Sequence, residues 1–422
     1  MKKLVGLILA IMMIAAVEAA FAVNSDTTQN AYNGIENSAN TIGIAKEIIF
    51  VNAENTTVRE PNITYTYTIA TTTPGTATIT GLDMTNKTTP LTSQVKAGPI
   101  EAVSAKTATV SFADINAKIT ATANGTSDRK YANFTFTPAT FGAAGIYRYQ
   151  ISETQSPAKA TVGIDEKAIY SATRYLDVYV KWDTNHENLE IYGYVLFEGT
   201  ATDSIEYNDT AELASKSQGF VDTSTTAGAH TDVDVYTTEN LLISKTTTGS
   251  MADKNHNFPV TITFTKASGL SDSIKLDFAV ANSGTLTKTG TDTNSVDYVT
   301  MDAALSGTVR DTSTITITGV PYGSTVTMTE TNNTYDSYRV KAGTTSGAAN
   351  LLTEATVAAN ATSGATTSQT LNAKQSIYIT NTLDAISPTG YVSRFAPYAL
   401  ILIGGIALLI IAKKRRPKEE EE

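Results

Sequence analysis

Short apolar segments alternate with polar, threonine-rich segments along most of the chain, and two longer apolar runs stand near its ends. Residues 65–69 and 145–151 place apolar side chains at every second position, which is typical of strands with one buried face. Helical periodicity is missing between the two ends. The pattern therefore predicts an all-β fold of short strands joined by polar turns.

The apolar run near the N-terminus has the layout of an export signal. Residues 1–3 contain two lysines, residues 4–16 are apolar, and residues 20–22 read Ala-Phe-Ala, a small-x-small cleavage site. The run is too short to be a stable membrane span. We therefore expect residues 1–22 to be a signal peptide and the mature, secreted chain to begin near Val23.

The apolar run near the C-terminus, residues 395–412, has about the minimum length that spans a bilayer as a transmembrane segment. The tail, residues 413–422, begins with lysines and arginines that favour the cytoplasmic side. Just before the span, residues 386–390 read Ile-Ser-Pro-Thr-Gly. This arrangement resembles the LPXTG-like sorting signal of Gram-positive surface proteins, with Ile-Ser in place of Leu-Pro and the proline one position later.

The resemblance implies that a sortase cuts between Thr389 and Gly390 and passes the Thr389 carbonyl to an amine. The alternative is an ordinary single-pass membrane anchor that is never cut. A proline-containing turn before the span and a basic stop after it favour the sorting signal.

Composition narrows the class of function. The 422 residues carry a net charge of -10, so a nucleic-acid-binding surface is not expected. There is no cysteine, so an exported protein of this sequence depends on its cores or on a cross-link other than a disulfide. The histidines, His186, His230 and His256, lack a neighbouring nucleophile pattern, so a hydrolase triad is not expected. Neither a metal nor a cofactor is predicted.

Several local patterns indicate how the strands are organised. Residues 175–182 and 189–197 flank a polar loop and predict a hairpin. The loop, residues 183–188, offers carboxylate and amide oxygens, but its spacing matches no calcium loop, so we expect a plain turn. The Ala/Thr/Ser-rich residues 342–370 are expected to be loop-like.

Some predicted strands carry a charged or amide side chain on the face that should point into a core. Residues of one parity share a face of a strand. Five such residues share a face with apolar neighbours: Lys46, Glu153, Lys245, Glu330 and Asn381. A sixth, Asn240, fits less well, because Tyr236 and Thr238 are its companions. An unpaired buried charge costs several kcal/mol, so these groups must be neutralised if they are buried. The simplest interpretations are that they form buried ion pairs or that they lie on edge strands and face solvent.

A lysine, a glutamate and an asparagine in a dry site can also react with one another. Burial lowers the pKa of a lysine and raises that of a glutamate, so both can be neutral. The amine can then attack the asparagine side-chain carbonyl while the protonated glutamate polarises it, and ammonia leaves. The product is an intramolecular Lys-Asn isopeptide bond.

The order of these residues resembles streptococcal-type major pilins with two tandem, self-cross-linked domains. The segments that carry the resemblance are residues 45–46, 145–153, 239–249, 326–330 and 378–381. The resemblance implies two immunoglobulin-like β-sandwich domains in series, at residues 23–240 and 241–385. It also implies two bonds and their assisting residues: Lys46 to Asn240 with Glu153, and Lys245 to Asn381 with Glu330.

The expected function is therefore structural: a pilus shaft subunit, polymerised head-to-tail with identical subunits by a sortase and attached to cell-wall peptidoglycan. A host surface or matrix is a further candidate partner. The resembling pilins carry an acceptor lysine at a position that falls near Val233, where this chain has none. Lys216 is the substitute candidate, with a plain solvated lysine as its alternative.

Two other functions compete with the shaft subunit. The first is a monomeric wall-anchored adhesin or ancillary pilin built from the same domains. The second is a wall-bound enzyme, which is disfavoured because no triad or metal constellation is present in the sequence. On either structural interpretation, Glu153 and Glu330 act once, on their own chain.

Overall fold

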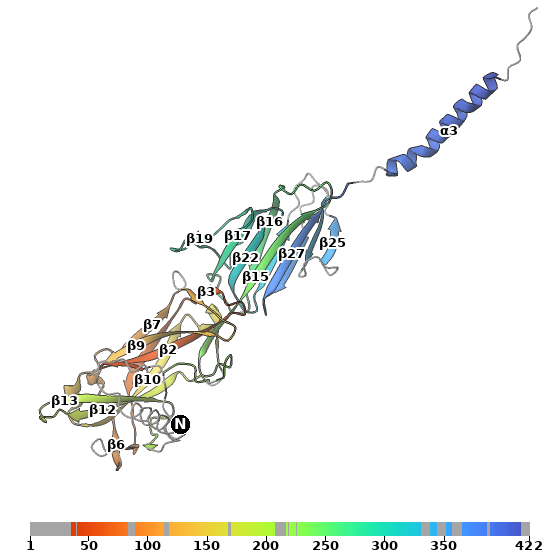
Figure 1. Cartoon of the computed structure of the whole chain (residues 1–422). Helices are drawn as coiled ribbons and strands as arrows, with labels where there is room; N and C mark the ends of the chain where they lie inside the picture. Colours follow the sequence, from red (N-terminus) through yellow and green to blue (C-terminus); the bar gives the residue numbers. More distant parts are fainter. Residues whose placement is uncertain are drawn as a thin grey trace, which may run out of the picture.

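The computed structural model describes residues 35–38, 40–82, 89–113, 118–167, 170–206, 217, 219–224, 226–330, 338–343, 352–356, 365–385 and 389–414. These residues form two β-sandwiches that lie end to end, followed by helix α3 (Thr389–Lys414) (Figure 1). The all-β fold, predicted from the alternation of apolar and polar positions, is confirmed. The apolar C-terminal helix, predicted from the run at residues 395–412, is confirmed as well.

The first sandwich consists of two facing layers and some short additions. One layer contains β1 (Ile35–Ser38), β2 (Thr41–Val51), β9 (Thr126–Thr135), β11 (Ile164–Glu166) and the first part of β15 (Asp234–Thr248). The other contains β4 (Ile63–Thr71), β5 (Thr78–Leu82), β6 (Pro90–Ala97), β7 (Thr107–Phe112), β10 (Gly145–Ser156), β12 (Thr173–Trp182), β13 (Leu189–Phe197) and β14 (Ile205–Glu206). A small ribbon and three short 3-10 helices complete it: β3 (Thr57–Arg59), β8 (Lys118–Thr120), η1 (Ile100–Ala102), η2 (Pro138–Phe141) and η3 (Lys159–Val162).

The core of the first sandwich follows from the two-residue period of its strands. In β4, Ile63, Tyr65, Tyr67 and Ile69 are buried, while the threonines between them are more exposed. The central strand β2 is buried at nine of its eleven positions and is paired on both sides, by β9 and β15. The predicted hairpin is present as β12 and β13, and its loop is closed as a turn by the side chain of Asp183.

The second sandwich repeats the two-layer plan. One layer contains β19 (Gly290–Thr291), β20 (Asp297–Thr300), β17 (Lys275–Ala281), β22 (Thr314–Pro321), the second part of β15, β27 (Gln375–Thr382), β24 (Arg339–Gly343) and β25 (Leu352–Thr356). The facing layer contains β18 (Gly284–Leu286), β21 (Leu305–Val309), β16 (Phe258–Thr265), β23 (Thr325–Glu330) and β26 (Ala365–Thr370).

The expectation that residues 342–370 form only loop is wrong. This stretch contains the end of β24 and all of β25 and β26. Threonine and serine suit the exposed face of a strand because their hydroxyls pair across it. Thr325 and Thr370, for example, share a hydroxyl hydrogen bond of 2.8 Å between β23 and β26.

Strand β15 belongs to both sandwiches. Its first residues pair in parallel with β2, and its last residues pair in parallel with β27. The pairing of β15 with β22 shifts register between Glu239 and Leu241. Tyr236 packs in the first core and Leu241 in the second, so the change of core takes place within one continuous strand.

Helix α3 contains the predicted membrane span. Its segment Pro397–Lys414 has a mean hydropathy of 1.8 and is not buried, so it is long and apolar enough to cross a membrane. Thr389 and Gly390 form the start of this helix, where a turn was expected. Residues 1–22 and 386–388, the predicted signal peptide and the rest of the sorting motif, lie outside the described residues.

Candidate cross-linking sites

The second sandwich brings Lys245, Glu330 and Asn381 together. Lys245 Nζ lies 2.5 Å from Glu330 Oε2, and Asn381 Nδ2 donates a hydrogen bond of 2.5 Å to Glu330 Oε1. The lysine is on β15 and the asparagine on β27, which are adjacent parallel strands, whereas the glutamate reaches across the core from β23. One carboxyl group thus bridges an amine and an amide, the geometry needed for a proton shuttle between them.

Burial sets the electrostatics of this second site. Lys245, Glu330 and Asn381 are at most 3% exposed, and the Phe258 ring centroid lies 3.8 Å from Lys245 Nζ. Burial lowers the pKa of Lys245 to about 8, against the opposing pull of the Glu330 charge. Asn381 Oδ1 is buried and accepts no hydrogen bond from the residues that the structure describes. The amide carbonyl is therefore available to a group that would polarise it.

The first sandwich holds Lys46 and Glu153 in a similar site, but its third member is Asp234. Lys46 Nζ lies 2.6 Å from Asp234 Oδ2 and 3.4 Å from Glu153 Oε2, and all three side chains are fully buried. Lys46 is on β2, Asp234 begins the neighbouring β15, and Glu153 comes from β10 in the facing layer. Burial lowers the pKa of Lys46, although the charges of Glu153 and Asp234 oppose it.

The structure does not bring Asn240 to Lys46. Asn240 lies six residues beyond Asp234, about 20 Å further along β15 at roughly 3.3 Å per residue. Its Oδ1 instead accepts hydrogen bonds from Asn52 Nδ2 at 3.3 Å and from the Gly319 amide at 3.4 Å. The Lys46–Asn240 pairing inferred from sequence is therefore corrected, and the group placed against Lys46 is the Asp234 carboxylate.

The two sites share one register, which supports the assignment of Asp234. In the second sandwich, Asn381 pairs with Thr247, two residues after the lysine on the adjacent parallel strand. In the first sandwich, Asp234 pairs with Ile48, again two residues after the lysine. Because side chains two residues apart share a face, this stagger places each amine diagonally against its acceptor.

Tyrosines surround the first site and donate to its carboxylates. Tyr65 OH donates a hydrogen bond of 2.7 Å to Asp234 Oδ2, and Tyr67 OH donates one of 2.6 Å to Glu153 Oε2. Burial raises the pKa of Tyr65 and of Tyr67 well above the usual value, so both remain donors. Tyr170 OH accepts a hydrogen bond of 2.8 Å from Lys46 Nζ and donates to Glu153 Oε1.

Sequence reasoning missed Asp234 and the nearby Lys159. Asp234 has the same parity as Asn240 on β15, so strand parity marks the two positions alike. Lys159 is brought into the site by η3, for which the sequence carries no strand pattern. Lys216, the candidate acceptor lysine, lies outside the described residues.

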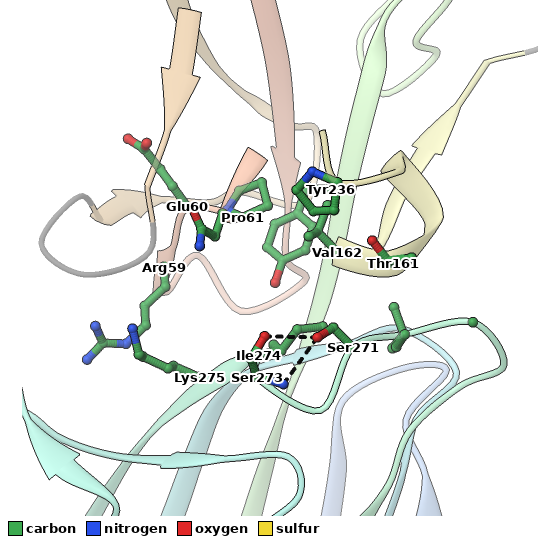
Figure 2. Close-up of a pocket in the computed structure, with 14 residues that line it drawn as sticks. Arg59, Glu60, Pro61, Thr161, Val162, Tyr236, Ser271, Ser273, Ile274 and Lys275 are labelled. Carbon is green, nitrogen blue, oxygen red and sulfur yellow. Dashed lines mark hydrogen bonds between the residues drawn. The ribbon is translucent and has the colours of Figure 1, made fainter. Parts of the chain in front are cut away.

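The two sandwiches also contact one another through buried charges. Arg59 and Lys118 of the first sandwich pair with Asp277 and Asp292 of the second at 2.6–3.0 Å; we call these four residues the seam cluster. Hydrogen bonds from Lys118 and from backbone amides outweigh burial and lower the pKa of Asp292 to about 2. A cavity of about 450 Å³ lies beside Arg59. Its walls include Val162, Tyr236, Ser271, Ile274 and Lys275, which are labelled in Figure 2.

A family model described as a domain of unknown function (DUF7601) matches residues 239–383. The comparison with curated proteins gives no match.

Solved structures align with this chain at low similarity. The major pilin from Streptococcus pyogenes is 14% identical, with 83% of this chain and 100% of that chain covered and a TM-score of 0.38. The T-13 major pilin from Streptococcus pyogenes serotype GAS131465 is 18% identical, with coverages of 82% and 100% and a TM-score of 0.34. The pilus-presented adhesin Spy0125 (Cpa) is 10% identical, with coverages of 81% and 100% and a TM-score of 0.28. Such values carry no information about individual residues.

Proposed function

We propose that this protein is a surface fibre subunit, a pilus shaft protein, in which each sandwich is closed by an autocatalytic isopeptide bond. The observation that carries the proposal is the position of Asp234 and Lys245 on one strand, β15. The first is the acceptor for the bond in the first sandwich, and the second is the amine for the bond in the second sandwich.

The two bonds would make a continuous covalent path through the subunit. Tension applied at Thr389 reaches Asn381 at the end of β27 and crosses the bond to Lys245. It then passes along β15 to Asp234 and across the other bond to Lys46. Almost all of each sandwich is bypassed by this path. A pulled subunit then transmits force without unfolding either core, which is what a covalently joined fibre requires.

The two reactions differ in their leaving group. At the second site, neutral Lys245 attacks the side-chain carbonyl carbon of Asn381, and ammonia leaves as Glu330 shuttles the proton. At the first site, Lys46 attacks the Asp234 carboxyl carbon, and one carboxyl oxygen leaves as water. The mass of the mature chain should therefore be lower than the calculated mass by one water and one ammonia. Two lysine–asparagine bonds would instead lower it by two ammonias.

Intact-mass spectrometry of the chain tests the cross-links. A deficit of one water and one ammonia is expected, and tandem spectra should show Lys46 joined to Asp234 and Lys245 joined to Asn381. A mass equal to the calculated value would contradict the proposal. Changing Glu330 to Ala should restore the ammonia alone, because the first site is separate from it.

We further propose that a sortase joins the Thr389 carbonyl to a neighbouring subunit and finally to peptidoglycan. A denaturing gel of cell-wall extract should show a ladder of high-mass species, which Thr389→Ala should collapse. The competing function, a monomeric wall-anchored adhesin, is favoured by the buried valine at 233, where the resembling pilins carry the acceptor lysine. One wall-linked band would support that competitor, and a ladder that persists in Lys216→Ala would exclude Lys216 as the acceptor.

A further inference from the structure

The first site contains a second lysine that the reaction described above does not use. Lys159 is 6% exposed, and its Nζ lies 2.9 Å from Asp234 Oδ1. Lys46 contacts the other oxygen of the same carboxylate, Oδ2. The Asp234 carboxylate is therefore held between two amines, one on each oxygen.

The extra cation matches the extra charge of the acceptor. At the second site the acceptor Asn381 is neutral. Among the residues that the structure describes, Lys245 is the only cation that forms an ion pair with Glu330. At the first site the acceptor is a carboxylate, which is a poor electrophile because its negative charge repels an attacking electron pair. Lys159 is the cation that offsets this charge.

The environments of the two lysines separate their roles. Burial lowers the pKa of Lys46, which favours the neutral amine that can attack. Burial also acts on Lys159, but the charges of Asp234 and Glu153 outweigh it and raise the pKa of Lys159. Neighbouring titratable groups pushed in opposite directions are a common mark of divided chemical roles.

Other contacts hold Lys159 in place as a cation. Its Nζ donates a hydrogen bond of 2.6 Å to Glu166 Oε2. Glu166 lies opposite Asp234 in the antiparallel pairing of β11 with β15. The Tyr170 ring centroid lies 3.8 Å from Nζ. Lys159 is on η3, outside the strand register that places Lys46 diagonally against Asp234.

We propose that Lys159 is a catalytic residue of the first cross-link, stabilising the negative charge on Asp234 Oδ1 while Lys46 adds to the carboxyl carbon. This role rests on the proposed cross-linking function. The two sites then differ in their acceptor, which is an amide at the second site and a carboxylate at the first. The carboxylate has to be activated, and Lys159 is the added residue that does so.

The atoms and charges of the step balance. The ammonium of Lys46 passes a proton to Glu153, and the neutral amine forms a bond to Cγ of Asp234. Oδ1 carries the negative charge beside Lys159. Oδ2 takes up two protons, the one that Glu153 received from the ammonium and one that Glu153 relays from the attacking nitrogen, and leaves as water. An ammonium and a carboxylate thus become an amide and water, and Lys159 and Glu153 end in their starting charge states.

Refolding the full chain in detergent, from an unfolded and uncross-linked preparation, tests the role of Lys159. Water loss and ammonia loss are followed by intact mass over time. Lys159→Met should slow water loss by roughly 10²-fold or more, as removal of one oxyanion donor does in enzymes. Ammonia loss at the second site should keep its rate and serves as the internal control. Lys159→Arg, which keeps the cation, should restore most of the rate.

A double variant separates chemistry from a structural role. In Lys159→Met with Asp234→Asn, the acceptor is neutral, so the first site should again form its bond quickly and lose ammonia. The role of Lys159 would be overturned if this rescue fails or if the rate of water loss is unchanged in Lys159→Met. Neither result would contradict the cross-link of the wild-type chain. A tandem spectrum joining Lys159 itself to Asp234 would also overturn it. Absence of water loss from the wild-type chain would instead refute the cross-linking function beneath it.

Discussion

Replacing Asp234 with Ala should remove the cross-link of the first sandwich, and the size of the effect can be worked from the structure. The bond from Lys46 to Asp234 closes nearly the whole first sandwich into a loop. In the chain-entropy treatment used for disulfides, a loop of this length is worth about 5 kcal/mol through the unfolded state. For a domain of this size, about 2–4 °C per kcal/mol gives a loss in Tm on the order of 10–20 °C.

The matched control is Asn240→Ala, because the sequence pattern points to Asn240 as the acceptor. That residue gives up hydrogen bonds to Asn52 and to the Gly319 amide, which is worth about 1–2 kcal/mol. Calorimetry should therefore show a shift of only a few degrees. Intact mass should show the water deficit lost in Asp234→Ala and kept in Asn240→Ala.

A second variant separates the covalent bond from the ion pair beneath it. Glu153→Gln keeps the contact of Lys46 with Asp234 but removes the proton shuttle. This variant should therefore show no water deficit, and its Tm should fall by about as much as that of Asp234→Ala. Asp234→Asn should keep the bond and exchange the water deficit for ammonia. The reasoning is refuted if Asn240→Ala abolishes the mass deficit of the first sandwich and Asp234→Ala preserves it.

The buried charges lead to two more expected outcomes. The reaction needs one proton shared by Lys245 and Glu330, and the pKa of Lys245, about 8, marks the pH at which this proton is lost. Ammonia release during refolding should therefore slow as the pH rises above about 8. A rate of ammonia release that increases through this pH would contradict the need for a shared proton. Arg59→Met breaks a buried pair of the seam cluster, worth about 3–5 kcal/mol, and should separate the calorimetric transitions of the two sandwiches. Lys254→Met, which removes an exposed ion pair, should not change the trace, and identical traces for the two variants would show that the seam cluster does not couple the sandwiches.

The second site could be predicted from sequence because strand parity is enough to specify it. Glu330 and Asn381 each share a face with buried apolar neighbours, in β23 and β27. Lys245 follows Leu241 and Ile243 on the buried face of β15 in the same way. The hydrophobic alternation therefore places all three polar side chains in one core, independently of the conformation of the loops between the strands.

The first site needed information that parity does not contain. Asp234 and Asn240 have the same parity on β15, so alternation cannot choose between them. The choice depends on where β15 stops pairing with β2, and that pairing ends at Thr237 opposite Val51. Lys159 was further out of reach, because a short helix after β10 carries it into the site.

Asn240, which is not the acceptor in the proposed cross-link, still lies on the proposed covalent path. Asn240 lies where β15 leaves the first sandwich and enters the second, at the register shift beside Leu241. Its amide contacts Asn52 of the first sandwich and Gly319 of the second, so it ties both to the strand at the point of exchange. Between Asp234 and Lys245 the proposed covalent path runs along β15 alone. In that stretch the position of the strand depends on its hydrogen-bonded neighbours, and Asn240 accepts two of these hydrogen bonds, one from each sandwich.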